Sequence, residues 1–196
     1  MAGHSSATSK HLPFSQNKNF IGRQDEMETL ERKLSIEQDC QKAAIVGLGG
    51  GGKTQVALQF ANSVLERHPD VSVLCVHVMK TDSFEHSCRE LANVLKILDT
   101  VNNKEGVREL VSRHLSKRVA GKWVLIAENA DDTSVLDGYD GNKSILDYLP
   151  ETESGLTVFA TRDKKTAQRL AGNKIVDAEK LELATATNPF NEILLQ

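Results

Sequence analysis

The chain has 196 residues, of which 39% are hydrophobic and 26% charged, a length and composition that predict one globular domain and exclude a fibrous repeat. Its 24 basic and 27 acidic side chains give a net charge of -3, which provides no strong field to attract nucleic acid or acidic lipid. It contains neither an apolar run of about 18 residues nor the apolar core of a signal peptide. We therefore expect a cytoplasmic protein with no nucleic-acid or membrane partner.

The N-terminal region divides at about residue 18. Residues 1–18 are rich in Ser, Lys, Asn and His and contain few large apolar side chains, a composition that predicts a flexible arm. The folded domain is expected over residues 19–196. Its first helix is predicted to begin at residues 23–26, because Met27, Leu30 and Leu34 then recur at three- and four-residue spacing.

Strands and helices then alternate along the chain. Short apolar runs predict strands at residues 42–47, 71–79, 122–127, 156–161 and 174–176. Apolar stripes with helical spacing predict helices over 54–67, 84–98 and 107–119. Most of 131–155 is expected to be loop, with a short helix at 145–148, and a last helix is expected to begin near Asn188. This alternation is typical of a parallel α/β sheet with helices on both faces.

The segment GLGGGGKT, Gly47–Thr54, lies between a predicted strand and a predicted helix and matches the pattern GxxxxGK[ST]. Glycines let backbone N–H groups approach phosphate oxygens closely, and the following helix presents its positive N-terminus to the same phosphates. We expect Lys53 to reach the β and γ phosphates and the Thr54 hydroxyl to ligate Mg²⁺. A flexible linker would explain the glycines, but not the lysine, the threonine or the flanking elements.

A Mg²⁺ ion held by Thr54 and phosphates needs a carboxylate from another strand, and Glu128 at the end of WVLIAE is the candidate. Four apolar residues followed by an acid is the Walker B form, although a solvated charge at a strand end is the competing interpretation. The usual acid is Asp. Glu places its carboxylate about 1.5 Å further from the backbone, which predicts strained or water-mediated ligation.

Three further residues are candidates for catalysis. Asp131 and Asp132 lie close enough to Glu128 in sequence to approach from the loop, although turn formation and helix capping compete with catalysis for both. Asn129 directly follows Glu128, so no second carboxylate stands beside the first. Arg162 follows a predicted strand and is expected either to touch the γ phosphate or to be a solvated loop charge.

The cysteines and histidines show no metal-ligand spacing. Cys40, Cys75 and Cys88 form no CxxC pair, and we interpret them as reduced packing residues. His77 and His86 are interpreted as a strand residue and a helix-start residue rather than ligands.

Four stretches, FIGRQDEMETL, AAIVGLGGGGKTQVALQFA, WVLIAENADD and TVFATRD, occur in this order between Phe20 and Asp163. Together they resemble the nucleotide-binding domain of NB-ARC proteins, the NLR-like signal-transduction ATPases with numerous domains, and most closely fungal members with tetratricopeptide repeats. The resemblance implies a three-layer P-loop NTPase fold with a five-strand sheet in the order 5-1-4-3-2. It also implies that residues 20–23 line the adenine and ribose. The expected nucleotide-binding residues are Phe20, Ile21, Gly22, Arg23, Gly47, Gly49, Gly50, Gly51, Gly52, Lys53, Thr54 and Gln55.

In the family that the chain resembles, ADP holds a closed state and exchange for ATP permits assembly. The chain departs from that family in three ways: Gly51 stands where Val is common, Glu128 replaces Asp, and the sequence ends before the helical and winged-helix subdomains. We therefore expect an ADP- or ATP-binding regulatory module with Mg²⁺ and slow or absent hydrolysis. Protein partners and oligomerisation would depend on domains absent here. The alternatives are a turnover ATPase and a degenerate module that binds no nucleotide.

Overall fold

The five expected strands form one parallel sheet in the computed structural model, which describes residues 8–12, 23–34, 41–98, 106–138 and 143–178. The strands are β1 (Gln41–Val46), β2 (Ser72–His77), β3 (Trp123–Glu128), β4 (Gly155–Thr161) and β5 (Ile175–Asp177). The helices are α1 (Gln24–Lys33), α2 (Lys53–Arg67), α3 (Thr81–Val94), α4 (Val107–Leu115), α5 (Thr133–Asp137) and α6 (Lys164–Ala171), with 3-10 turns η2 (Arg118–Ala120) and η3 (Leu146–Tyr148).

The strand order is β2-β3-β4-β1-β5, which is the expected order read from the other edge. β4 therefore lies between β1 and β3, so the strand that precedes Arg162 separates the strand before the glycine loop from the strand that ends at Glu128. The register pairs Val46 with Thr161, and His77 with Glu128. Because all the strands are parallel, these four residues lie together at the carboxyl ends of the strands, where open α/β sheets bind ligands.

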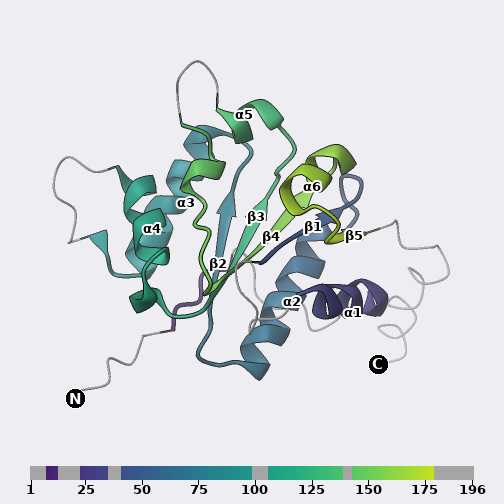
Figure 1. Cartoon of the computed structure of the whole chain (residues 1–196), viewed down its shortest axis with the longest axis horizontal. Helices are drawn as coiled ribbons and strands as arrows, with labels where there is room; N and C mark the ends of the chain where they lie inside the picture. The colour runs from purple at the N-terminus through teal and green to yellow at the C-terminus, as the bar shows by residue number, and fades with distance from the viewer. Residues whose placement is uncertain (1–7, 13–22, 35–40, 99–105, 139–142, 179–196) are drawn as a thin grey trace, which may run out of the picture.

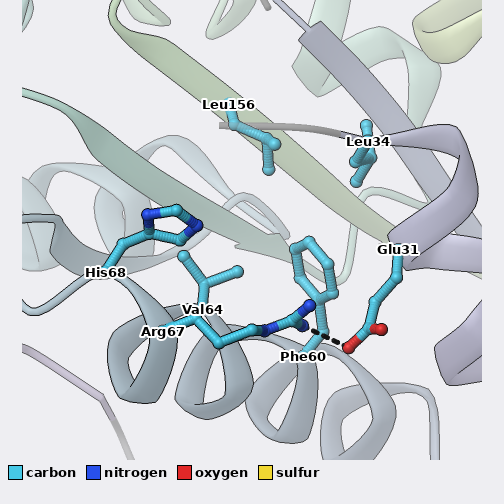
Figure 2. Close-up of a pocket in the computed structure, with 7 residues that line it drawn as sticks. All are labelled: Glu31, Leu34, Phe60, Val64, Arg67, His68 and Leu156. Atoms are coloured by element: carbon cyan, nitrogen blue, oxygen red, sulfur yellow. Dashed lines mark hydrogen bonds and ion pairs between the residues drawn. The ribbon is translucent and has the colours of Figure 1, made fainter. Parts of the chain in front are cut away.

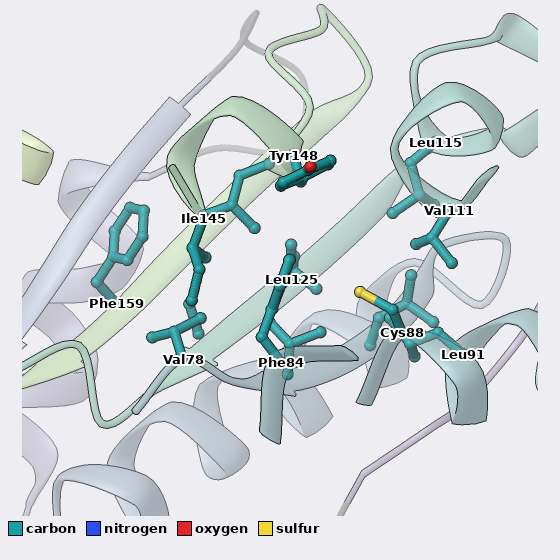
Figure 3. Packing of buried hydrophobic residues seen from close by; sticks show 14 of the residues in the cluster. Val78, Phe84, Cys88, Leu91, Val111, Leu115, Leu125, Ile145, Tyr148 and Phe159 are labelled. Atoms are coloured by element: carbon teal, nitrogen blue, oxygen red, sulfur yellow. The ribbon is translucent and has the colours of Figure 1, made fainter. Parts of the chain in front are cut away.

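Helices cover both faces of the sheet (Figure 1). α1 and α2 pack on one face together with Val124 and Ile126, whereas α3 and α4 pack on the other together with Leu125 and Ala127. Figure 3 shows this second cluster, in which side chains of α3 and α4 surround Leu125. Since side chains alternate between faces along a strand, Glu128 lies on the face that α2 covers.

α1 and α2 also contact each other away from the glycine loop. Arg67, at the end of α2, pairs with Glu31 of α1 beside a cavity of about 170 Å³ (Figure 2). The cavity is lined by Glu31, Leu34, Phe60, Val64, Arg67, His68 and Leu156. It lies at the carboxyl end of α2, whereas the glycine loop precedes the amino end of the same helix.

The structure corrects three predicted boundaries and adds two helices. The helix predicted over 84–98 is α3, which begins at Thr81 and ends at Val94. β2 ends at His77 and Met79 is half exposed, so the strand predicted over 71–79 is shorter than expected. α4 ends at Leu115, and Val119 is exposed in the following 3-10 turn rather than on a buried helical face. α5 and α6 were not predicted, because both are short and begin at aspartate caps rather than with long apolar stripes. The predicted short helix at 145–148 is confirmed as η3.

Residues 8–12 lie beside the sheet, although they fall in the expected flexible arm. Lys10 forms a parallel bridge with Val73, where the His11 N–H donates to the Val73 carbonyl at 2.8 Å. The Val73 N–H donates in turn to the Ser9 carbonyl at 2.9 Å. These bonds satisfy the outer edge of β2, which would otherwise present unpaired backbone groups.

Cys75 and Cys88 are buried and free, which confirms that they are reduced packing residues. Burial raises the pKa of both thiols, that of Cys88 to about 12. Cys40 and the helix predicted near Asn188 lie outside the described residues. None of the helices in the described ranges is long and apolar enough to cross a membrane.

Candidate functional site

The loop between β1 and α2 needs glycine at several positions for geometric reasons. Gly50 and Gly52 both have φ of 75°, in the left-handed region that favours glycine. A Cβ on Gly47 would lie 2.3 Å from the carbonyl oxygen of Ala178, because the Ala178 N–H donates to the Val46 carbonyl and brings the two backbones together. The loop is therefore a specific closely packed turn, which the linker interpretation does not account for.

Gly51, the glycine that departs from the family pattern, is in a tight position without a left-handed backbone. Its N–H donates to the Leu48 carbonyl at 3.0 Å, and a Cβ on Gly51 would lie 3.0 Å from the same oxygen. A larger residue there would require the neighbouring backbone to move by a few tenths of an ångström. Gly49 lies on the other side of the loop, where a Cβ would be 4.0 Å from Cδ of Arg162.

Lys53 is the first residue of α2, and its side chain folds back over the loop. Its Nζ donates to the carbonyls of Gly47 at 2.8 Å and Leu48 at 2.9 Å. Desolvation lowers the pKa of Lys53, while the charge of Asp131 raises it and the charge of Arg162 lowers it. The ammonium group therefore lies at the loop within electrostatic reach of two other predicted site residues. Thr54 and Gln55 follow in the first turn of α2 and are partly exposed.

The side chain of Arg23 contacts the glycine loop. Its side chain is almost fully buried, pairs with Glu26, and donates from Nη2 to the Gly51 carbonyl at 2.8 Å. The structure thus brings Arg23 to the predicted loop. Phe20, Ile21 and Gly22 lie outside the described residues, so their expected place beside an adenine ring stays a prediction.

Glu128 is buried, with 4% of its surface exposed, which excludes the interpretation that it is a solvated charge. Its Oε2 lies 3.3 Å from Nδ1 of His77 on the neighbouring strand, whereas its Oε1 is buried without a hydrogen-bond partner among the described residues. A buried carboxylate oxygen is costly unless something binds it. This oxygen is therefore the atom of Glu128 that could accept a cation.

His77 is a site residue that the sequence interpretation missed. It was interpreted as a strand residue, and it is one, but the β2–β3 register places it directly beside Glu128. The contact could have been predicted only from the register of β2 against β3, because the sequence around His77 and the sequence around Glu128 do not indicate it separately.

The two aspartates after β3 have different partners. Asn129 has φ of 58°, a left-handed conformation that Asn tolerates, and the chain turns there so that the Ala130 N–H donates to the Ala160 carbonyl at 2.9 Å. Asp131 then accepts from Arg162, through Nε at 2.7 Å and the backbone N–H at 2.6 Å.

Asp132 caps α5 and accepts from both the backbone N–H and the hydroxyl of Ser134. These bonds lower the pKa of Asp132. The contacts of Asp132 are therefore those of a helix cap, which was one of the roles considered for this residue.

The described site thus combines a glycine loop at the amino end of a helix with a lysine over that loop. A buried acid lies two strands away, and an arginine directly follows the strand between them. A parallel sheet in this strand order that carries these features defines a P-loop NTPase fold. Residues 23–192 match the NB-ARC domain family, and the chain belongs to that family.

A protein of the fungus Hyaloscypha variabilis, described as a nucleotide-binding leucine-rich repeat (NLR)-like protein, is 36% identical to this chain over 180 residues. The match covers 87% of this chain and 18% of that protein, so the chain spans about a fifth of its relative's length.

Solved structures share the fold at low sequence identity. The Aeropyrum pernix ORC1 protein in complex with DNA matches 94% of this chain and 52% of its own, with a TM-score of 0.64 and 16% identity. Cdc6p from Pyrobaculum aerophilum matches 94% and 51%, with a TM-score of 0.59 and 14% identity. Domain III of Thermotoga maritima DnaA matches 93% and 76%, with a TM-score of 0.52 and 13% identity. At these identities the likeness shows the fold alone.

Proposed function

We propose that this chain is a nucleotide-dependent regulatory module that binds ADP or ATP with Mg²⁺ and hydrolyses ATP slowly or not at all. The observation that carries the proposal is the position of Lys53, whose ammonium group is held at the loop carbonyls of Gly47 and Leu48. If phosphate oxygens entered the loop, the Lys53 ammonium would exchange its neutral carbonyl partners for negatively charged ones. Because charge-assisted hydrogen bonds are stronger, this exchange favours phosphate binding.

The chain's own residues fit a magnesium ion. Thr54 and Glu128 would hold it together with the phosphates, and the ion would neutralise phosphate charge. The buried Oε1 of Glu128 has no hydrogen-bond partner among the residues that the structure describes, and this supports the assignment, since a bound cation would satisfy that oxygen. Within the described ranges, no group of three or more His, Cys, Asp and Glu residues could hold a metal by itself. The phosphates would therefore supply part of the coordination.

The environment of the carboxylates argues against rapid turnover. Efficient hydrolysis needs a group that orients or activates water, and Asn129 stands next to Glu128 where a second acid would serve. Asp131 is bonded to Arg162 and Asp132 to Ser134. The printed contacts thus give Asp131 the role of holding Arg162 and Asp132 the role of capping α5, which favours the switch over the turnover ATPase.

Titration of the purified chain with ADP and with ATP, by calorimetry in the presence of Mg²⁺, tests the proposal. We expect binding of both nucleotides that is lost in Lys53→Ala. The matched control is Lys42→Ala, since Lys42 lies near the amino end of β1, away from the loop, and pairs with Glu151. If neither nucleotide binds at millimolar concentration, the degenerate module is the better description.

Phosphate release separates the switch from the turnover ATPase. We expect less than one turnover per chain over many minutes at saturating ATP. Steady release that disappears in Lys53→Ala would instead support the enzymatic alternative. The expected absence of a nucleic-acid partner is tested in the same preparation by the anisotropy of labelled duplex DNA, which we expect to stay constant.

A further inference from the structure

We propose that the outer edge of β2 is a recognition site for an extended segment that carries a lysine, and that a second copy of this chain can supply this segment. Residues 8–12 of the same chain, the edge segment, occupy the site in the structure. The site lies near the amino end of β2, whereas the glycine loop follows the carboxyl end of β1. It is therefore separate from the proposed nucleotide site, and its test does not depend on nucleotide binding.

The backbone of the edge segment pairs with a single residue of β2. The Val73 N–H donates to the Ser9 carbonyl at 2.9 Å, and the His11 N–H donates to the Val73 carbonyl at 2.8 Å. These two bonds are the ones by which a parallel strand pairs with one residue of its neighbour. Backbone pairing contributes affinity but selects no particular sequence, so any selectivity comes from side chains.

Two buried polar side chains make this edge selective. Asn62 of α2 is 4% exposed and Ser72 of β2 is 3% exposed. The Asn62 amide group donates to the Leu58 carbonyl of its own helix at 2.8 Å, and its Oδ1 accepts from Nζ of Lys10 at 3.0 Å. The Ser72 hydroxyl oxygen accepts from the Ser9 N–H at 3.1 Å. Buried polar atoms are costly without partners, so this edge favours a segment with a lysine at the position of Lys10.

Side chains of the edge segment lie alternately on the two faces of the sheet. Leu12 packs against the apolar cluster on the face that α2 covers, which is also the side of Lys10 and its partner Asn62. Nε2 of His11 lies 3.7 Å from Oε2 of Glu90, which belongs to α3 on the other face. This alternation is that of a strand, so the site takes an extended segment between α2 and α3.

A second copy of the chain carries a segment with the same chemistry. The bonds of Ser9 and Lys10 reach across 63 and 52 positions of the sequence. Such contacts depend on the site rather than on the chain that carries the segment, so the segment of another copy would make the same ones. Residues 13–22 join the edge segment to Arg23, and a connection of this length spans up to about 33 Å when extended. Exchange between neighbouring molecules is therefore within reach.

The chain's own edge segment competes with a segment from outside. Because it is tethered, its effective concentration is on the order of 1 mM, so an external segment gains access when the tethered one is weakened. Lys10→Ala removes the partner of Asn62, and His11→Pro removes the N–H that donates to Val73. The full-length chain with both changes is the open-edge variant.

The test measures binding of a fluorescent peptide with the sequence ATSKHLP, residues 7–13. We expect the open-edge variant to bind it about tenfold more tightly than the wild-type chain does. The same peptide with Lys10→Glu should bind about tenfold more weakly than the native peptide, because it lacks the charged donor for Asn62. Absence of binding at millimolar concentration, or equal binding of the two peptides, would overturn the proposal.

Two further variants test the cause of the selectivity. Asn62→Leu in the open-edge variant removes the accepting oxygen and should abolish the difference between the two peptides. Lys33→Ala is the matched control, since Nζ of Lys33 donates to the Asn173 carbonyl away from β2. A gain of peptide binding in Lys33→Ala as large as that of the open-edge variant would mean that loss of any lysine contact has the effect, and the assignment would be lost.

Analytical ultracentrifugation tests exchange between copies. The open-edge variant is mixed with a chain that has Asn62→Leu and an intact edge segment, so that only one partner carries a complete site and only the other a complete segment. We expect a one-to-one complex in the mixture and monomers of each chain alone. Monomers in the mixture at millimolar concentration would overturn the role of the second copy.

A measurement on the wild-type chain keeps the proposal testable if the open-edge variant does not fold. Several millimolar peptide should displace the tethered segment, so the ring signals of His11, assigned by their loss in His11→Gln, should move in a proton spectrum. The Val73 amide should stay protected from hydrogen exchange, because the peptide replaces the bonds of the segment. Ring signals that stay in place would overturn the proposal.

Discussion

Nδ1 of His77 lies 3.3 Å from Oε2 of Glu128, and the two residues face each other across adjacent parallel strands. The contact gives one oxygen of a buried carboxylate a partner and leaves Oε1 without one in the described structure. Where the family usually has Asp, the longer Glu side chain thus reaches His77 on the next strand. A buried carboxylate oxygen without a partner costs stability, and a bound cation would offset that cost.

Glu128→Gln should therefore raise the stability of the free chain and reduce its response to nucleotide. A neutral amide is less costly to bury than an unpartnered carboxylate oxygen, so we expect the melting temperature without ligand to rise by a few degrees. The further rise on adding Mg²⁺-ADP should shrink, since affinity falls on the order of tenfold or more.

Glu109→Gln is the matched control for that experiment. Glu109 also has a buried oxygen without a partner among the described residues, but it contacts Tyr148 far from the loop in sequence. Its variant should keep the full wild-type response to Mg²⁺-ADP. Thermal melts followed by intrinsic fluorescence give both numbers, and a full nucleotide response in Glu128→Gln would contradict the assignment of this acid.

Gly155→Ala should be among the most destabilising conservative changes in the chain. A Cβ at this position would lie 2.1 Å from Cζ2 of Trp123, whose side chain is almost fully buried. Overpacking of this kind costs about 1–3 kcal/mol. Urea unfolding should show the loss.

Trp123→Phe tests the cause of that loss, because the clashing atoms belong to the six-membered ring of the indole that phenylalanine does not place there. We expect the double variant Gly155→Ala, Trp123→Phe to lose less unfolding free energy than the sum of the losses in the two single variants. Simple additivity would show that the clash is relieved elsewhere, and would contradict this explanation.

The stability of the fold should decrease on mild acidification through His114. Desolvation lowers the pKa of His114 below its ordinary 6.5, and the nearby charge of Lys117 lowers it further. The unfolded chain therefore binds a proton before the folded chain does. Stability from this residue is complete above about pH 6.5 and is lost as the pH falls toward the lowered folded pKa. In His114→Gln, the decrease in melting temperature between about pH 7.5 and pH 5.5 should be smaller; an equal or steeper decrease would contradict the assignment.

The amino end of α6 should depend on Asp163. This carboxylate accepts from the backbone N–H and the hydroxyl of Thr166, both at 2.7 Å, and these bonds lower the pKa of Asp163. We expect Asp163→Ala to lower the melting temperature by a few degrees and Asp163→Asn to lower it less, because Asn also caps helices.

The acid dependence gives a second check on this cap. Because the folded pKa of Asp163 is depressed, its contribution is present above about pH 3.9 and is lost as the pH falls through the lowered value. The difference between wild type and Asp163→Ala should therefore narrow in acid. A difference that is constant with pH would mean that the charge of Asp163 has no part in capping.

Much of the fold and part of the candidate site could be predicted because their signals are local. The run from β1 through the glycines to Lys53 and α2 is continuous in sequence. A short apolar run predicted the strand, and helical periodicity predicted the helix. The strand order came from the family resemblance and was confirmed, since short apolar runs do not say which strands are neighbours. α5 and α6 were missed because their evidence is an aspartate cap followed by only one or two turns.

By itself, the sequence determined that a phosphate-type loop joins a buried strand to an amphipathic helix, because glycine conformation and helical periodicity are properties of neighbouring residues. Only the tertiary structure decided what surrounds that loop. Arg23 and Gly51 are 28 residues apart, and Asp131 and Arg162 are 31 apart. Asp131 and Arg162 meet because the parallel strands that precede them end on the same side of the sheet, whereas Arg23 reaches the loop because α1 packs beside α2. These distances depend on register and packing, which no local pattern encodes.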